Sequence, residues 1–130
     1  MEIFSFRMVS IESRPSTLKA KCKCDSSNTV SDWIIKSNSA VCSYCGRTHN
    51  GRFYDVCKAK CKCDSSDTVS DWLVADNKVV CAYCGRTYSG NFVEIRRHAA
   101  KCKCDSSNTI SDWFVKSDDE WVCSYCGRTR

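Results

Sequence analysis

Cysteine is the residue type in this chain whose number and spacing point to chemistry. The 130 residues include 13 cysteines, and all but one fall into Cys-x-Cys and Cys-x-x-Cys pairs that alternate along the sequence. Each Cys-x-Cys is followed, after 17 or 18 residues, by Cys-x-x-Cys-Gly-Arg-Thr. Four thiolates brought together by such pairs form a tetrahedral metal site, most commonly for zinc. The predicted ligands of about three Zn²⁺ ions are Cys22, Cys24, Cys42 and Cys45; Cys61, Cys63, Cys81 and Cys84; and Cys102, Cys104, Cys123 and Cys126.

The cysteine pairs belong to a phrase of about thirty residues that occurs three times. Repetition at a period near forty predicts an array of one small structural unit. A short aromatic and aliphatic segment precedes each phrase, as Phe-x-x-Val at residues 6–9 and 53–56 and Phe-x-x-Ile at 92–95. Such a segment is typical of a short strand. The predicted units are residues 1–48, 49–87 and 88–130.

Within a unit, the residues between the cysteine pairs predict a β-hairpin. Residues 29–36 are rich in β-forming side chains, and the turn cluster Ser-Asn-Ser follows at 37–39. A second short strand then leads into the Cys-x-x-Cys. Sustained helical periodicity is absent, although residues 94–101 are compatible with a turn or two of helix. The predicted fold class is therefore a set of small, metal-stabilised, β-rich repeats.

Units of about forty residues are too small to fold on a hydrophobic core alone and need disulfides or a metal. Disulfides would imply secretion. The N-terminal residues do not resemble a signal peptide, no Asn-x-Ser/Thr acceptor occurs, and the cysteine count is odd. No apolar stretch is long enough to cross a membrane. These features favour metal thiolates in an intracellular protein, in the nucleus or cytoplasm, over disulfides in a secreted one.

The Cys-x-x-Cys-Gly-Arg-Thr motif resembles the knuckle of zinc ribbons and rubredoxin-type sites. Gly46, Gly85 and Gly127 stand where such a knuckle needs positive φ, which frees backbone N–H groups to face sulfur. The resemblance implies three zinc-ribbon-like four-cysteine modules in tandem. The first pair departs from a standard ribbon, because it is Cys-x-Cys. The same short pair occurs in SWIM-type fingers, which however end in Cys-x-His, so no specific family is identified.

A second pairing of ligands is also compatible with the sequence. Cys57 and His98 each lie four residues before the next Cys-x-Cys, which produces variants of the classical zinc finger. That pairing leaves six cysteines unused, whereas the ribbon pairing uses twelve in three identical sets. Leu18 occupies the matching place in the first unit. We therefore predict that Cys57 and His98 are not ligands, and that Cys57→Ser leaves metal content and thermal stability nearly unchanged. Four thiolates also suit iron.

Aromatic and basic residues recur at fixed places around the cysteines. Trp33, Trp72 and Trp113 stand at the same place in the three copies and are predicted to form the core of each unit. A tyrosine lies between the knuckle cysteines, and Lys or Arg flanks both pairs. These side chains either contact nucleic acid or offset the negative charge of the thiolates. The candidate nucleic-acid contacts are Lys23, Tyr44, Arg47, Lys62, Tyr83, Arg86, Lys103, Tyr125 and Arg128.

The sequence favours binding over catalysis. Zinc held by four thiolates has no open position for a reacting water, and no catalytic constellation or phosphate-binding loop is present. The formal net charge of +5 falls to about −1 once three four-thiolate zinc ions are counted, so bulk charge selects no partner. Single-stranded nucleic acid or RNA is the expected partner, and a protein-interaction scaffold with purely structural zinc is the alternative. Neither a membrane nor a small-molecule substrate is expected.

Overall fold

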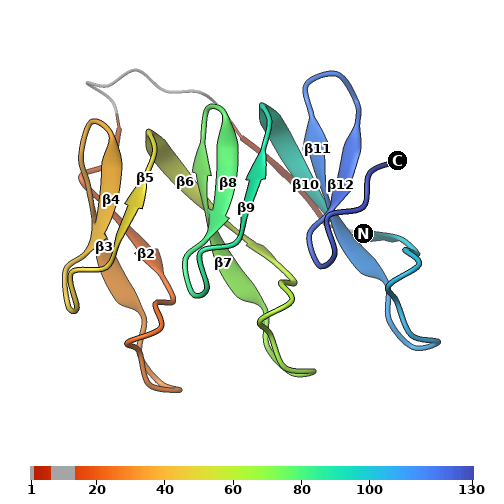
Figure 1. Ribbon diagram of the computed structural model, residues 1–130, viewed down its shortest axis with the longest axis horizontal. Helices are drawn as coiled ribbons and strands as arrows, with labels where there is room; N and C mark the ends of the chain where they lie inside the picture. The colour runs from red at the N-terminus through yellow and green to blue at the C-terminus, as the bar shows by residue number, and fades with distance from the viewer. Residues whose placement is uncertain (1, 7–13) are drawn as a thin grey trace.

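A computed structural model describes residues 2–6 and 14–130 of the chain. Within these residues the protein is all-β and has no helix, which confirms the predicted fold class. Twelve strands form three antiparallel sheets of four strands each. The three sheets stand side by side in a row along the long axis of the molecule, from left to right in Figure 1.

Each sheet is one repeat, and in the first two the strands follow chain order. These sheets run β2-β3-β4-β5 and β6-β7-β8-β9. The bounds in the first sheet are Thr17–Ala20, Ser31–Ile35, Ser39–Cys42 and Thr48–Asn50. Those in the second are Phe53–Ala59, Ser70–Ala75, Lys78–Cys81 and Thr87–Ser89. The third sheet contains β10 (Phe92–Ala100), β11 (Ser111–Lys116) and β12 (Trp121–Cys123).

The third sheet takes its fourth strand from the other end of the sequence. Strand β1 (Glu2–Ser5) pairs antiparallel with β10, with Glu2 opposite Arg97 and Phe4 opposite Ile95. From the sequence, the Phe-x-x-Val of residues 6–9 is predicted to begin the first unit. The structure instead places the strand before it, β1, in the third sheet. Phe6 donates its N–H to Val93 O at 2.8 Å in the third sheet, and residues 7–9 lie outside the described residues. Strand β2 begins the first sheet instead, and the unit boundaries stay a prediction.

Residues 94–101, which are compatible with helix in isolation, lie mostly in strand β10. Pairing with β11 on one edge and β1 on the other supplies the backbone partners of this segment. Tertiary pairing therefore overrides a weak local preference, as is common for short segments.

The hydrophobic core lies between neighbouring sheets. One cluster joins Ala40 of the first sheet to Leu73 and Val80 of the second. Another joins Val79 of the second sheet to Phe92 and Phe114 of the third. Each repeat buries its apolar face on the next one, so the three stack into a single array, as in repeat proteins generally.

The three tryptophans are buried, as predicted from the sequence. Trp33 and Trp72 are fully buried, and Trp113 is 1% exposed. Each indole Nε1–H donates to the backbone oxygen of the alanine that precedes the Lys-Cys-Lys-Cys motif, at 2.9 Å. This bond satisfies the polar edge of a buried indole and ties the hairpin to the first cysteine pair.

Candidate metal centres

The four cysteines of each repeat form a compact cluster. In each cluster all four Sγ atoms lie within 4.8 Å of one another. In the first, Cys22 and Cys45 are 3.7 Å apart, as are Cys24 and Cys42. The matching distances in the other two range from 3.6 to 3.8 Å. Sulfurs about 2.3 Å from a tetrahedral zinc are about 3.8 Å apart, whereas a disulfide needs about 2.05 Å. The donor set and spacing fit a metal ion, and all thirteen cysteines are free of disulfides.

The knuckle places backbone donors on the sulfur atoms. Gly46, Gly85 and Gly127 have φ of 82°, 85° and 83°, in the left-handed region that the resemblance to zinc ribbons predicts. Beyond the glycine, Arg47 N donates to Cys45 Sγ at 3.4 Å, and Arg86 N donates to Cys84 Sγ at 3.5 Å. Such N–H···S contacts stabilise thiolates and orient them toward a metal.

The first cysteine pair is held by the Asp-Ser-Ser loop that follows it. Asp25 accepts from Cys22 N at 2.8 Å and from Ser31 N at 2.9 Å. Lys21 Nζ closes the loop by donating to the carbonyl oxygens of Ser26 and Thr29. Lysines at the matching places donate to carbonyl oxygens of the corresponding loops in the other two repeats. These lysines therefore have a structural role in the loop.

A serine that sequence reasoning missed lies against each cluster. Ser31 Oγ is 3.6 Å from Cys24 Sγ, Ser70 Oγ is 3.4 Å from Cys63 Sγ, and Ser111 Oγ is 3.6 Å from Cys104 Sγ. All three serines are buried. Their signal in the sequence is the Ser-Asp-Trp triplet that every copy contains. Each hydroxyl is thus a hydrogen-bonding partner of a cysteine sulfur, and that of Ser70 also donates to Asp64 Oδ1 at 3.0 Å.

The ligand thiols differ in acidity because their hydrogen bonds differ. The Cys61 thiol donates to Cys81, which lowers the pKa of Cys81 to about 5. Burial opposes ionisation of Cys42, but hydrogen bonds from Ser31 and from backbone N–H groups outweigh it and lower its pKa to about 6. Burial raises the pKa of Cys22 to about 12. Thiols must lose their protons to bind a metal, and the hydrogen bonds at Cys42 and Cys81 favour that loss.

Cys57 and His98 lie outside the three clusters, in agreement with the ribbon pairing. Cys57 is buried on β6, opposite Trp72, and burial raises its pKa well above the ordinary thiol value. His98 has φ of 53° and is exposed, and its backbone N donates to Asp112 at 2.8 Å. The burial of Cys57 corrects one expectation, because a serine there would bury a hydroxyl and would not leave stability unchanged.

The aromatic and basic residues of the knuckles are not equivalent in the three repeats. Tyr44 is 81% exposed, whereas Tyr83 and Tyr125 are half-buried. Lys23 Nζ lies 5.9 Å from the centre of the Tyr83 ring, and Lys62 Nζ lies 5.7 Å from that of Tyr125, so each lysine contacts the next repeat. Among the other candidate contacts, Arg86 is half-buried. The exposed ones are Arg47, Lys103 and Arg128.

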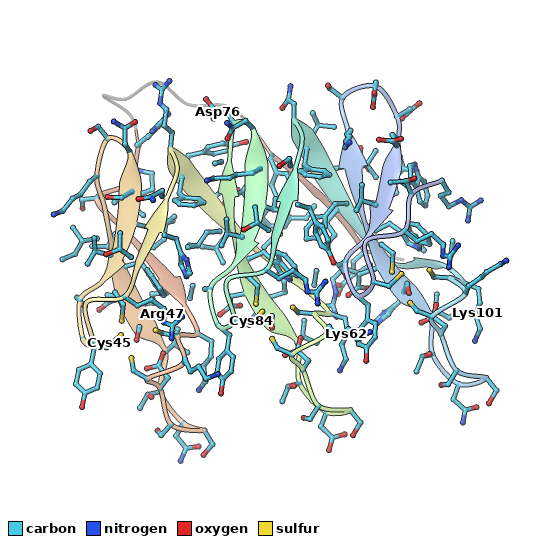
Figure 2. The ribbon with its side chains drawn as sticks, viewed as in Figure 1. Cys45, Arg47, Lys62, Asp76, Cys84 and Lys101 are labelled. Atoms are coloured by element: carbon cyan, nitrogen blue, oxygen red, sulfur yellow. The ribbon has the colours of Figure 1, made fainter. Side chains whose placement is uncertain are left out.

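The cysteine clusters and the hairpin turns lie at opposite ends of the sheets. Figure 2 shows Cys45, Arg47, Cys84 and Lys101 toward one end of the stacked sheets and Asp76 toward the other. The basic residues that flank the clusters are therefore gathered at the metal end, where they stand near the charge of the thiolates.

The aspartate of each Ser-Asp-Trp triplet joins neighbouring repeats. Asp71 accepts from Lys21 N at 2.7 Å, and Asp112 accepts from Lys60 N at 2.9 Å. From the sequence, such aspartates are expected to hold turns within their own repeat, because nothing local reveals a partner fifty residues away. Cross-repeat bonds of this kind fix the spacing of neighbouring units.

A ring residue after each Cys-Gly-Arg-Thr of the first two repeats covers the tryptophan of its own repeat. His49 stacks on Trp33 with ring centres 5.2 Å apart, and Tyr88 stacks on Trp72 at 5.5 Å. The polar tips of both residues reach the next knuckle. His49 Nε2 lies 3.4 Å from the backbone oxygen of residue 82, and Tyr88 Oη donates to that of residue 124 at 2.9 Å.

In the residues that the structure describes, no helix is both long and apolar enough to cross a bilayer. Comparisons with known proteins found no matching family model, no similar curated protein and no similar solved structure. The function must therefore be inferred from the three cysteine clusters and the fold around them. The chain is an array of three β repeats, each with a group of four cysteines that could hold a metal ion.

Proposed function

We propose that the chain is a non-enzymatic repeat scaffold, held by three structural zinc ions, that binds a protein partner along one edge of its stacked sheets. Four thiolates per cluster fill a tetrahedral ion and leave no site for a reacting water. The apolar stacking of the repeats makes one rigid body from three small ones. Rigid arrays of this kind generally serve as binding surfaces.

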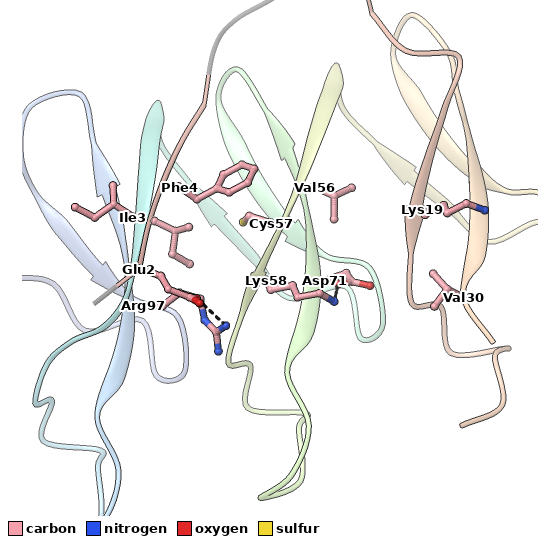
Figure 3. A pocket seen from close by; sticks show the side chains of 11 residues that line it. Glu2, Ile3, Phe4, Lys19, Val30, Val56, Cys57, Lys58, Asp71 and Arg97 are labelled. Atoms are coloured by element: carbon pink, nitrogen blue, oxygen red, sulfur yellow. Dashed lines mark hydrogen bonds and ion pairs between the residues drawn. The ribbon is translucent and has the colours of Figure 1, made fainter. Parts of the chain in front are cut away.

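The observation that carries this proposal is the position of β1. This short extended segment lies on the edge of β10, and the same edge of β6 has no paired strand among the described residues. A groove of about 840 Å³ lies beside β6 and is bordered by β1. Figure 3 shows Phe4 on one side of this groove, Val56 and Lys58 along it, and Lys19 and Val30 on the far side.

The edge of β6 repeats the chemistry of the edge that β1 covers. Lys58 of β6 pairs with Asp71 at 2.8 Å, as Arg97 of β10 pairs with Asp112 at 3.4 Å. On β1, Glu2 adds a second carboxylate 3.3 Å from Arg97. Lys58 is exposed and available for the same kind of contact.

These features define the partner as an extended segment with an acidic residue and an apolar residue two positions later, as in Glu2 and Phe4. Such a segment would pair with β6 by strand addition, with its acidic side chain at Lys58 and its apolar side chain over the groove. Val56 N–H now contacts the carboxylate of Asp55 at 2.8 Å. A bound strand would replace that local bond, which protects an exposed edge from non-specific pairing.

The test uses the synthetic peptide EIFSF, the sequence of residues 2–6. We expect its addition to the zinc-loaded protein to shift the backbone NMR signals of residues 55–58. Lys58→Gln should weaken binding, and Lys36→Gln, at another exposed lysine, should not. Shifts confined to β10 would mean that the peptide only exchanges with β1, and this result would contradict the proposal. The absence of any shift at saturating peptide would contradict it as well.

Nucleic acid is a second candidate partner, and one observation favours it. Arg47 and Arg128 are exposed directly after their metal knuckles, and Tyr44 offers an exposed ring for base stacking. The other two knuckle tyrosines are already in contact with lysines, so a stacking row of three equal rings is not available. Charge reversal of Arg47, Arg86 and Arg128 should abolish a salt-sensitive affinity for single-stranded RNA while three metal ions remain bound.

A further inference from the structure

The two internal interfaces of the array use the same contacts. At each, an aspartate accepts a backbone N–H from the preceding repeat, a lysine lies over the knuckle tyrosine, and a ring residue reaches a knuckle carbonyl. The first repeat has no repeat in front of it among the described residues, and the third has none behind it. Each end therefore presents one half of an interface that the molecule itself forms twice.

The forward face of the first repeat exposes residues that the other repeats bury. Ile34 is 42% exposed, whereas its counterparts Leu73 and Phe114 are fully buried against the preceding sheet. Tyr44 is exposed where Tyr83 and Tyr125 lie under a lysine. An aliphatic and an aromatic side chain thus mark a docking face that is complete but uncovered.

Asp32 shows that this face retains its hydrogen-bonding capacity. Asp71 uses Oδ1 for Lys58 of its own repeat and Oδ2 for the N–H of Lys21 in the preceding one. Asp32 likewise uses Oδ1 for Lys19, at 2.7 Å. Its Oδ2 has no partner among the described residues, and its side chain is 51% exposed.

The rear face of the third repeat offers the matching donors. Lys101 stands where the two earlier repeats donate a lysine N–H to the next aspartate, and its own N–H has no acceptor within the described part of the chain. Lys103 corresponds to the two lysines that cover tyrosines. Arg130 takes the place of the two stacking rings. Its guanidinium carbon lies 5.7 Å from the centre of the Trp113 ring and 5.6 Å from that of Trp121.

We infer that the rear face of the third repeat binds the forward face of the first repeat of a second copy of this chain. In that contact Lys101 N–H donates to Asp32 Oδ2, and Lys103 lies over Tyr44. Arg130 donates to the backbone oxygen of residue 43, which corresponds to the knuckle oxygens that accept from the stacking rings inside the array. The cationic side chains of the rear face then meet the Asp32 carboxylate and the Tyr44 ring, as the corresponding lysines meet Asp71 and Tyr83 inside the array.

The contact joins two different faces, so it does not close on itself. Each copy would be added along the axis on which the repeats stack within one copy. Head-to-tail association therefore gives an open chain of copies. One repeat offers only a small contact area. We therefore expect weak, concentration-dependent association, with a dissociation constant of about 10 μM to 1 mM.

The test is sedimentation velocity of the metal-loaded protein over a range of concentrations. We expect the average sedimentation coefficient to rise steadily with concentration. The pair Asp32→Ala and Tyr44→Ala blocks the forward face, and the pair Lys103→Ser and Arg130→Ser blocks the rear face. Each double variant should lose at least about tenfold in affinity, because each removes a hydrogen bond to a charged group. All four positions are exposed, and three bound metals and an unchanged circular dichroism spectrum check that each variant folds.

Mixing the two double variants distinguishes head-to-tail contact from other kinds of association. Each variant alone should stay monomeric, whereas an equimolar mixture should form a dimer and no larger species, since one good interface remains. Ile110→Ser is the matched control and should associate like the wild type, because Ile110 is 48% exposed but lines the groove between the second and third repeats. A monomer at every concentration, variants that associate normally, or a mixture that stays monomeric would each overturn the inference.

Discussion

The metal end of each repeat and the faces between the sheets are specified in different ways. At the metal end, the Cys-x-Cys, Ser-Asp-Trp and Cys-x-x-Cys-Gly-Arg-Thr elements are the same in all three copies, and the sulfur geometry agrees within a few tenths of an ångström. Between the sheets, residues at matching positions differ. Ala40, Val79 and Trp121 form one such set. We expect the constant part to supply most of the folding energy of each unit and the variable part to determine which unit follows which.

The difference has a physical basis. A metal site tolerates little change in ligand type or distance, so each copy must repeat it. A packed apolar interface requires only that facing volumes match, and Ala40 against Leu73 or Val79 against Phe114 are two solutions. The two internal interfaces therefore share their polar contacts and differ in their apolar packing.

Loss of a ligand should have the largest effect. Cys63→Ser opens the middle cluster, and because that repeat packs against both neighbours, the whole array should lose stability. We expect two bound metals in place of three and a loss of about 10 kcal/mol or more of apparent folding energy, as for structural zinc generally. Metal analysis together with thermal melting checks this, with Cys57→Ala as the control. Three metals bound to the Cys63→Ser protein would rule out the ligand assignment.

Breaking a cross-repeat bond should come next. Asp112 is 1% exposed and accepts from Lys60 N, His98 N and Arg97. Asp112→Ala leaves buried donors unpaired and should cost about 3–5 kcal/mol. The matched change Asp32→Ala, at an exposed position, should cost no more than about 1 kcal/mol. Equal losses in urea denaturation would show that the aspartates act only within their own repeat.

Substitution of the buried Cys57 should have a smaller effect on stability, and its size should depend on the polarity of the new side chain. Cys57→Ser places a hydroxyl against the apolar interior beside Trp72 and should destabilise the protein by about 1–3 kcal/mol. Cys57→Ala removes only the sulfur and should cost less. Both variants should keep three metals, as metal analysis and urea denaturation together can establish. Loss of a metal from either variant would revive the finger pairing that uses Cys57.

The smallest expected effect is on the pH dependence of stability. It arises at His49, which occupies the place that Tyr88 takes in the next repeat. Burial lowers the pKa of His49 below its ordinary value of 6.5. The unfolded chain therefore takes up a proton before the folded chain does, and stability falls as the pH decreases below about 6.5. His49→Tyr should remove this part of the pH dependence of the free energy of unfolding, and His98→Asn, at an exposed position, should not. Identical slopes for wild type and His49→Tyr would contradict a neutral, stacked His49.

The sequence predicted the metal end better than the interfaces for a definable reason. Ligand spacing, knuckle glycines and the buried tryptophans are local features, and Gly46 and Trp33 lie as expected. One edge of β10 pairs with β1, about ninety residues away, and one of the donors to Asp112 is Lys60 N, in the preceding repeat. Such long-range pairings leave no periodic mark in the sequence. The serines beside the sulfurs carried a signal, the repeated Ser-Asp-Trp triplet, but its role became clear only from the fold.

We infer that three metal centres of four cysteines each hold the stacked sheets together. Native mass spectrometry of the purified chain tests it most directly, followed by chelation while circular dichroism is recorded. We expect three zinc ions per chain and loss of β structure as they are removed, because forty-residue repeats cannot fold without them. A chain that binds fewer than three metals, or that keeps its β structure after complete chelation, would contradict it.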